Sequence, residues 1–124
     1  MKIAQGFSQA STFDSAIKYS ELAIALAKKI GLKKAQAAAL NILAISYWYT
    51  DNYPLALARQ MDALKIWEET GNKRGRAICY GNIGLINYDR GNYPEALKNY
   101  LIALRLNEEM GNKELLGITY TNIG

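Results

Sequence analysis

Residues 52–84 read NYPLALARQMDALKIWEETGNKRGRAICYGNIG, and residues 92–124 read NYPEALKNYLIALRLNEEMGNKELLGITYTNIG. The second stretch follows the first at a spacing of forty residues, without a gap and with about half of its positions identical. Self-similarity at a fixed period of this length is the signature of a stacked repeat array. The two stretches therefore predict an architecture in which one structural unit recurs along the chain.

Composition favours helices over strands. The chain has 124 residues, of which 50% are hydrophobic and 21% charged, and this balance is typical of a folded domain. Alanine and leucine are abundant and valine is absent, and no segment alternates with a period of two. We therefore expect an all-α fold without a sheet.

The spacing of apolar residues predicts a series of helices separated by short turns. A first segment, 1–10, ends where Ser11 and Thr12 offer a helix N-cap. In the helix that follows we expect Leu22 to Leu26 and Ile30 to lie on a broad buried face, and in a later one we expect Met61 and Trp67 to be buried. The predicted helices after the N-cap are 13–30, 33–49, 54–70, 73–90, 94–110 and one that begins near residue 113.

Charge and chemistry point away from catalysis. The formal charge is +4 and the chain has no histidine. Lysines and arginines are scattered, with only Lys28-Lys29, Lys33-Lys34 and Lys73-Arg74 adjacent. We therefore expect solvated helix surfaces and no nucleic-acid partner. No nucleophile has a base nearby in sequence, so we predict no enzyme activity, no metal and no cofactor. Cys79, the only cysteine, fits a small buried residue.

No apolar run reaches membrane-spanning length, and no secretory signal is visible at Met1–Lys2. We therefore expect no membrane insertion. The expected location is the cytoplasm, or the periplasm if the chain comes from a membrane sensor.

A family resemblance rests on residues 77–104. Tyr80 is followed by Ile83-Gly84, then by Gly91-Asn92-Tyr93, Glu95-Ala96, Tyr100 and Ala103-Leu104. This order resembles the tetratricopeptide repeat pattern. In that pattern, small residues at Gly84, Ala96 and Ala103 let the two helices of a repeat approach closely. Residues 37–70 match more loosely, because Asp51 and Gln60 replace the usual glycine and aromatic residue.

The resemblance implies a right-handed α-α superhelix, or solenoid, of antiparallel helix pairs. It divides residues 1–124 into a single array with a partial repeat 1–30, repeats 31–70 and 71–110, and a half repeat 111–124. The period of forty, rather than thirty-four, resembles arrays attached to bacterial sensor kinases, cyclases and transcription regulators, and eukaryotic cell-polarity adaptors. We therefore expect a protein–protein interaction scaffold from a larger signalling protein.

In this family the first helix of each repeat lines a concave face that holds a peptide or partner protein. Positions of a terminal-carboxylate clamp carry Ile78, Asn82, Leu85 and Ile118 here, so the resemblance implies an apolar or aromatic ligand. The amides of Asn82 and Asn122 can hold a peptide backbone, or can equally cap or bridge helices. Aromatic residues on this face can instead pack between helices, which is the favoured reading. The expected partner-binding residues are Asn41, Trp48, Tyr49, Asn82, Leu85, Tyr88, Asp89 and Asn122.

Two alternatives stay open beside the scaffold. Ile118, Tyr120 and Ile123 lie in a final half-helix that has no following helix to cover them, so we expect a fragment of a longer array. Such ends could join copies end to end or exchange helices. The chain could also be a sensory segment that passes a signal to an attached regulator domain.

Overall fold

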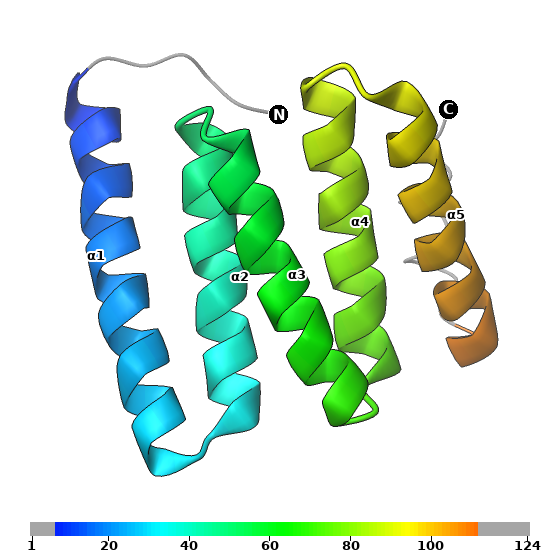
Figure 1. The fold of residues 1–124 in the computed structure, drawn as a ribbon, viewed down its shortest axis with the longest axis horizontal. Helices are drawn as coiled ribbons and strands as arrows, with labels where there is room; N and C mark the ends of the chain where they lie inside the picture. The colour runs from blue at the N-terminus through cyan, green and yellow to red at the C-terminus, as the bar shows by residue number, and fades with distance from the viewer. Residues whose placement is uncertain (1–6, 112–124) are drawn as a thin grey trace. The chain divides into compact units, whose positions relative to one another are not determined.

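The chain is an all-α helical repeat. The computed structural model describes residues 7–111, and these contain five helices and no strand (Figure 1). The bounds agree with the predicted helices to within one residue from the second helix onward. The helices are α1 (Phe7–Ile30), α2 (Lys33–Tyr49), α3 (Tyr53–Glu69), α4 (Lys73–Asp89) and α5 (Tyr93–Met110).

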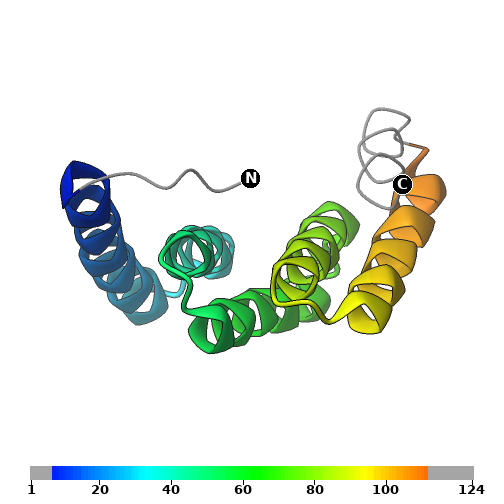
Figure 2. The same ribbon diagram turned by 90° about the horizontal axis from the view of Figure 1, so that it is seen from above.

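The chain forms two compact units, residues 1–63 and 64–124, and the boundary falls within α3. In the first unit α1 lies antiparallel to α2, and in the second α4 lies antiparallel to α5 (Figures 1 and 2). The right-handed superhelix and the division into repeats stay predictions.

The predicted break at Ser11–Thr12 is wrong, because α1 runs through it without interruption. Serine and threonine cost a helix only a few tenths of a kcal/mol relative to better formers, and neither glycine nor proline occurs within α1. The tendency of these two residues to cap a helix is therefore too weak to end the helix that surrounds them.

The predicted buried face of α1 is also wrong in part. Leu22, Leu26 and Ile30 are more than half exposed. The side of α1 that is covered carries Ser20 and Ala27, which are both buried. The helix that contacts α1 is α2. Within the described residues the broad apolar surface of α1 is therefore only partly buried.

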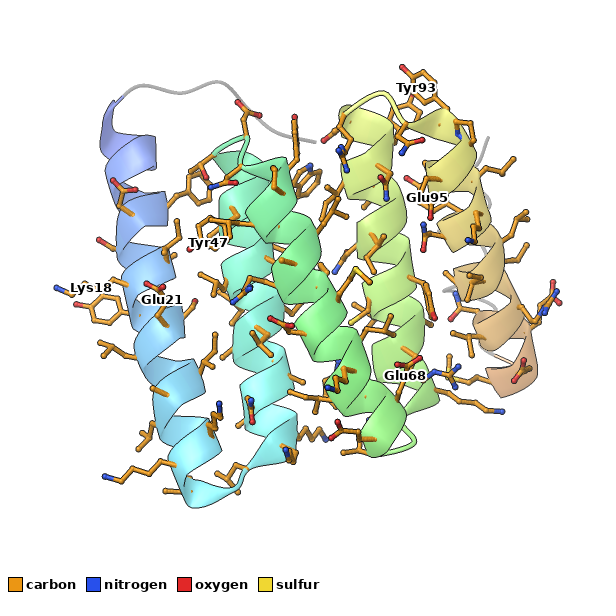
Figure 3. All side chains as sticks on the ribbon, viewed as in Figure 1. Lys18, Glu21, Tyr47, Glu68, Tyr93 and Glu95 are labelled. Atoms are coloured by element: carbon orange, nitrogen blue, oxygen red, sulfur yellow. The ribbon has the colours of Figure 1, made fainter. Side chains whose placement is uncertain are left out.

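The core of the first unit follows the predicted stripe of α2. Leu40, Leu43 and Ala44 are buried, and Tyr47 lies between α1 and α2 (Figure 3). Phe13 of α1 stacks on Tyr49 of α2, with ring centroids 5.0 Å apart and planes 10° from parallel. Offset stacking of this kind adds to the energy of area burial, so the aromatic pair joins the start of α1 to the end of α2.

Part of the prediction for α3 is wrong. Ala63 and Leu64 are buried as expected, but Met61 is 59% exposed and Trp67 is half-buried. Gln60 takes the inward direction instead, with no exposed surface. Because successive helical residues point about 100° apart, a fully buried Gln60 turns Met61 away from the core.

Two glycines allow close packing in the second unit. A Cβ atom on Gly75 would overlap the indole ring of Trp67, and one on Gly84 would lie 2.8 Å from the ring of Tyr100. The first copy of the repeat has alanine at both equivalent places, opposite the smaller Ala27 and Gln60. Large rings and glycines therefore occur together, which confirms the expected role of Gly84.

Candidate functional site

Helix α4 carries an open face within the second unit. Its start is fixed by Asn72, whose side chain accepts a hydrogen bond from the backbone N–H of Gly75 at 2.7 Å. Ala77, Cys79, Ile83, Gly84 and Ile86 are buried and hold the helix in the unit. The residues left on the open face are exposed or half-exposed, and they are Arg74, Ile78, Gly81, Asn82, Leu85, Tyr88 and Asp89.

The spacing of this open α4 face makes it continuous. Ile78, Asn82, Leu85 and Asp89 follow one another at intervals of four, three and four residues, which places them along one side of a helix. The predicted site residues Asn82, Leu85, Tyr88 and Asp89 are therefore together on α4. The middle of the face combines the apolar Ile78 and Leu85 with the amide of Asn82, and the face has Arg74 at one end and Asp89 at the other.

Gly81 lies in the middle of the open α4 face. A Cβ atom at this position would meet no neighbouring atom within 4 Å. Glycine inside a helix costs roughly 1 kcal/mol relative to alanine. At Gly75 and Gly84 this cost is offset, because the missing side chain makes room for an aromatic ring. At Gly81 no neighbouring group of the unit uses the space, so packing does not explain the glycine. Its bare backbone leaves space for a group from outside.

Tyr88 is half-exposed and packs edge-on against Tyr93 of α5, with ring centroids 5.3 Å apart. Tyr93 lies at the α4–α5 turn (Figure 3). The pair holds the Tyr88 ring in place, since edge-to-face aromatic contacts are favourable. Tyr88 therefore combines a packing contact with a surface that a partner could reach.

The predicted residues of α2 have contacts within the first unit. The Gln60 side-chain N–H donates to the Asn41 side-chain oxygen at 2.8 Å, so Asn41 links α2 to α3. Tyr49 stacks on Phe13, and Trp48 lies against Tyr49 with ring centroids 5.2 Å apart. All three residues are half-buried. These are packing contacts, which the sequence analysis gave as the alternative to partner binding.

Several predicted positions lie outside the described residues. They are Asn122 of the binding set and Ile118, Tyr120 and Ile123 of the self-association set.

Sequence reasoning missed the Asn41–Gln60 pair. The repeat contains a signal for this pair. Gly81 and Tyr100 occupy the equivalent positions forty residues later, so Asn41 and Gln60 are both replaced in the second copy. The empty space beside Gly81 was missed as well, because no pattern of residues in the sequence indicates it.

Two titratable groups inside the second unit, Cys79 and Tyr100, have pKa values shifted toward their neutral forms. Burial, helped by the negative charge of Glu68, raises the pKa of the Cys79 thiol to about 12. Burial also raises the pKa of Tyr100 to about 12, with smaller contributions from Asp89 and Tyr88. A protonated thiol is a poor nucleophile and metal ligand. Over residues 7–111 there is no cluster of three or more His, Cys, Asp or Glu placed to hold a metal ion.

The ends of α4 and α5 are also joined by charge. Lys73 Nζ lies 3.0 Å from Glu109 Oε1, with both side chains about half exposed. An exposed pair of this kind contributes little to stability. Among the described helices none is both long and apolar enough to cross a membrane.

A comparison with known families identifies a repeat family. The family model described as tetratricopeptide repeat matches residues 35–109, which run from α2 almost to the end of α5. No curated protein matches the chain.

Proposed function

Because the chain belongs to the tetratricopeptide repeat family, a family of protein–protein interaction scaffolds, we propose that it holds an extended segment of a partner protein along the open α4 face. Gly81 is the observation that carries this proposal. A helix that keeps a glycine where nothing fills the space gives up stability, and such local losses are typical of functional positions.

The residues of the open α4 face indicate what kind of segment fits. Ile78 and Leu85 offer apolar contacts on either side of Gly81. The Asn82 amide can both donate to and accept from a peptide backbone. The face runs from Arg74 to Asp89, about 22 Å at 1.5 Å per residue, which is enough for roughly six or seven extended residues. We propose a short apolar segment with charged flanks, bound without catalysis.

Gly81→Ala separates binding from stability. We expect the free energy of unfolding to rise by roughly 0.5–1 kcal/mol, because alanine is the better helix former and its methyl group meets nothing. The same methyl group enters the space that the partner would use, so binding should weaken about tenfold. Peptides selected from a random display library against the immobilised chain provide the ligand, and calorimetric titration measures its affinity.

Asn82→Ala should weaken the same peptide by about fivefold, as expected for one lost hydrogen bond. Lys98→Ala is the matched control, because Lys98 is exposed and belongs to α5 and not to α4. If Gly81→Ala and Asn82→Ala bind as tightly as the control, the open α4 face is not the site. In a regulator the same site would receive a signalling peptide and act on an attached domain.

Self-association is the second candidate, and one observation favours it. Tyr93, Leu97 and Leu101 follow each other at four-residue spacing on α5 and are 59%, 47% and 49% exposed. An apolar stripe of this kind is a common interface feature. Light scattering should then show a mass above one chain that falls after Leu97→Glu with Leu101→Glu but not after Lys98→Glu. A single-chain mass at high concentration would exclude this candidate.

A further inference from the structure

The turn between α1 and α2 has an unusual surface. Residues 28–34 read KKIGLKK, and all four lysines are exposed. The two aliphatic residues among them, Ile30 and Leu32, are 57% and 53% exposed. The turn joins the two antiparallel helices at one end of the first unit (Figure 1). It therefore presents aliphatic and cationic side chains from one tip, which we call the basic turn.

The internal repeat supplies a comparison within the same chain. The turn forty residues later, 68–74, reads EETGNKR, and the third copy, 108–114, reads EEMGNKE. The basic turn carries four positive charges, whereas in 68–74 two glutamates balance Lys73 and Arg74 to zero. Both turns join consecutive helices of the array, so the extra charge is not required by the fold.

Exposure of Ile30 is a property of the turn itself. Its counterpart Thr70, at the turn between α3 and α4, is exposed as well. The side chain at this place therefore points to solvent in both copies. An isoleucine that is 57% exposed gains little from packing, whereas a threonine suits water.

Leu32 gives up a helix cap. Asn72, its counterpart, accepts a hydrogen bond from the Gly75 N–H at 2.7 Å, while Leu32 makes no side-chain cap. Lys33 and Lys34 place positive charge in the first turn of α2, where the helix dipole favours negative charge, as Lys73 and Arg74 also do in α4. Lys28 and Lys29 suit the last turn of α1, where the helix dipole favours positive charge. The exposed Ile30 and the uncapped Leu32 are the departures from good local chemistry, and packing within the unit explains neither of them.

We propose that the basic turn docks on the surface of a bilayer that contains anionic lipids. The four lysines would lie among the negative headgroups, and Ile30 and Leu32 would enter the boundary between headgroups and acyl chains. Lysines attract anionic lipid electrostatically, and aliphatic side chains add hydrophobic burial at that depth. Such adsorption needs no spanning helix. A nucleic acid would attract the lysines but offers no apolar layer for two aliphatic side chains, so the membrane is the better match.

Co-sedimentation with lipid vesicles tests the proposal on the whole chain. Vesicles of phosphatidylcholine with phosphatidylserine should bind the chain, and vesicles of phosphatidylcholine alone should not. Added salt should weaken binding, because it screens exposed charges. Equal binding to both kinds of vesicle would overturn the proposal.

Charge reversal locates the site. Lys28→Glu with Lys29→Glu restores the acidic pair of the second copy and should weaken vesicle binding by about tenfold or more. Lys65→Glu with Lys98→Glu is the matched control, because it makes the same change in net charge at exposed positions on α3 and α5. Equal loss in both double variants would show attraction by net charge alone and would overturn the assignment to the basic turn.

A second double variant tests the aliphatic residues. Ile30→Thr with Leu32→Asn installs the residues of the second copy and keeps every lysine. We expect vesicle binding to fall about fivefold, while the midpoint of thermal unfolding stays unchanged or rises, because asparagine can cap α2. This pair of results excludes unfolding as the cause. Unchanged vesicle binding would show that the lysines alone attract the bilayer, and would overturn the role given to Ile30 and Leu32. Binding of polyglutamate without binding of anionic vesicles would indicate an acidic protein partner and overturn the proposal.

Discussion

Gly84→Ala should lower the free energy of unfolding by about 2 kcal/mol, even though alanine is the better helix former. The added methyl group would lie 2.8 Å from two carbons of the Tyr100 ring and 3.3 Å from the backbone oxygen of Ala96. Tyr100 and Ala96 are both buried, so neither can move away freely. Urea unfolding followed by circular dichroism measures the loss.

Gly81→Ala is the control on the same helix, three residues earlier. Its methyl group meets nothing within 4 Å, so the same substitution should stabilise the chain. Opposite signs from one chemical change would show that the ring of Tyr100, and not the helix, sets the cost at Gly84.

The first copy of the repeat suggests a rescue. There Ala44 and Gln60 occupy the places of Gly84 and Tyr100, and both are buried. In a Tyr100→Gln background, Gly84→Ala should therefore cost little or nothing. A double-mutant cycle isolates this coupling from the cost of losing the ring. The packing explanation fails if Gly84→Ala is equally destabilising in both backgrounds.

The helix bounds were the part of the fold that could best be predicted from the sequence. Helix bounds depend on local signals, such as Pro54 after a turn, or Gly71 at a helix end with a φ of 70°. Those signals recur every forty residues, so a helix end that is poorly marked in one copy can be located from the other copy. The predicted bounds of α2 are therefore the observed ones, and those of α4 differ by one residue.

Burial was harder to predict, because it depends on which neighbours are present. Leu22 and Leu26 have the apolar character of core residues, yet the side of α1 that carries them is not covered. Met61 shows the same difficulty, since the inward direction belongs to the polar Gln60. Hydrophobicity alone does not distinguish a covered side from an open one.

The candidate site was predicted as a set of positions, but not as a set of contacts. Asn82, Leu85 and Tyr88 could be placed on one helix by spacing. The bond between Asn41 and Gln60 joins residues nineteen positions apart on different helices, and only the fold brings them together. The space around Gly81 likewise appears only when the neighbouring side chains are in place.

Alkaline solution should destabilise the chain by several kcal/mol, and Cys79 should account for the largest part. The thiol ionises near its ordinary pKa of 9.0 in the unfolded chain but near about 12 in the fold. Above pH 9 the unfolded state therefore binds fewer protons than the folded state, so the free energy of unfolding falls as pH rises. The stabilisation is complete below pH 9 and is lost progressively toward about pH 12.

At about pH 11 this loss amounts to about 3 kcal/mol for Cys79, at 1.36 kcal/mol for each pH unit. Tyr100, whose pKa rises from 10.0 to about 12, adds a smaller loss that begins near pH 10. Urea unfolding at a series of pH values measures the slope. Cys79→Ala should flatten the profile from pH 9, and Tyr100→Phe should flatten it from pH 10.

Because Cys79 is the only cysteine, its protonation can also be followed directly. A thiol-reactive disulfide reagent should modify the urea-unfolded chain quickly at about pH 8 and the folded chain very slowly, since burial both shields the sulfur and keeps it protonated. The rate in the folded chain should then rise as pH approaches about 12. Parallel pH profiles for the wild-type chain and Cys79→Ala would contradict the explanation, because the buried thiol is the group that distinguishes them.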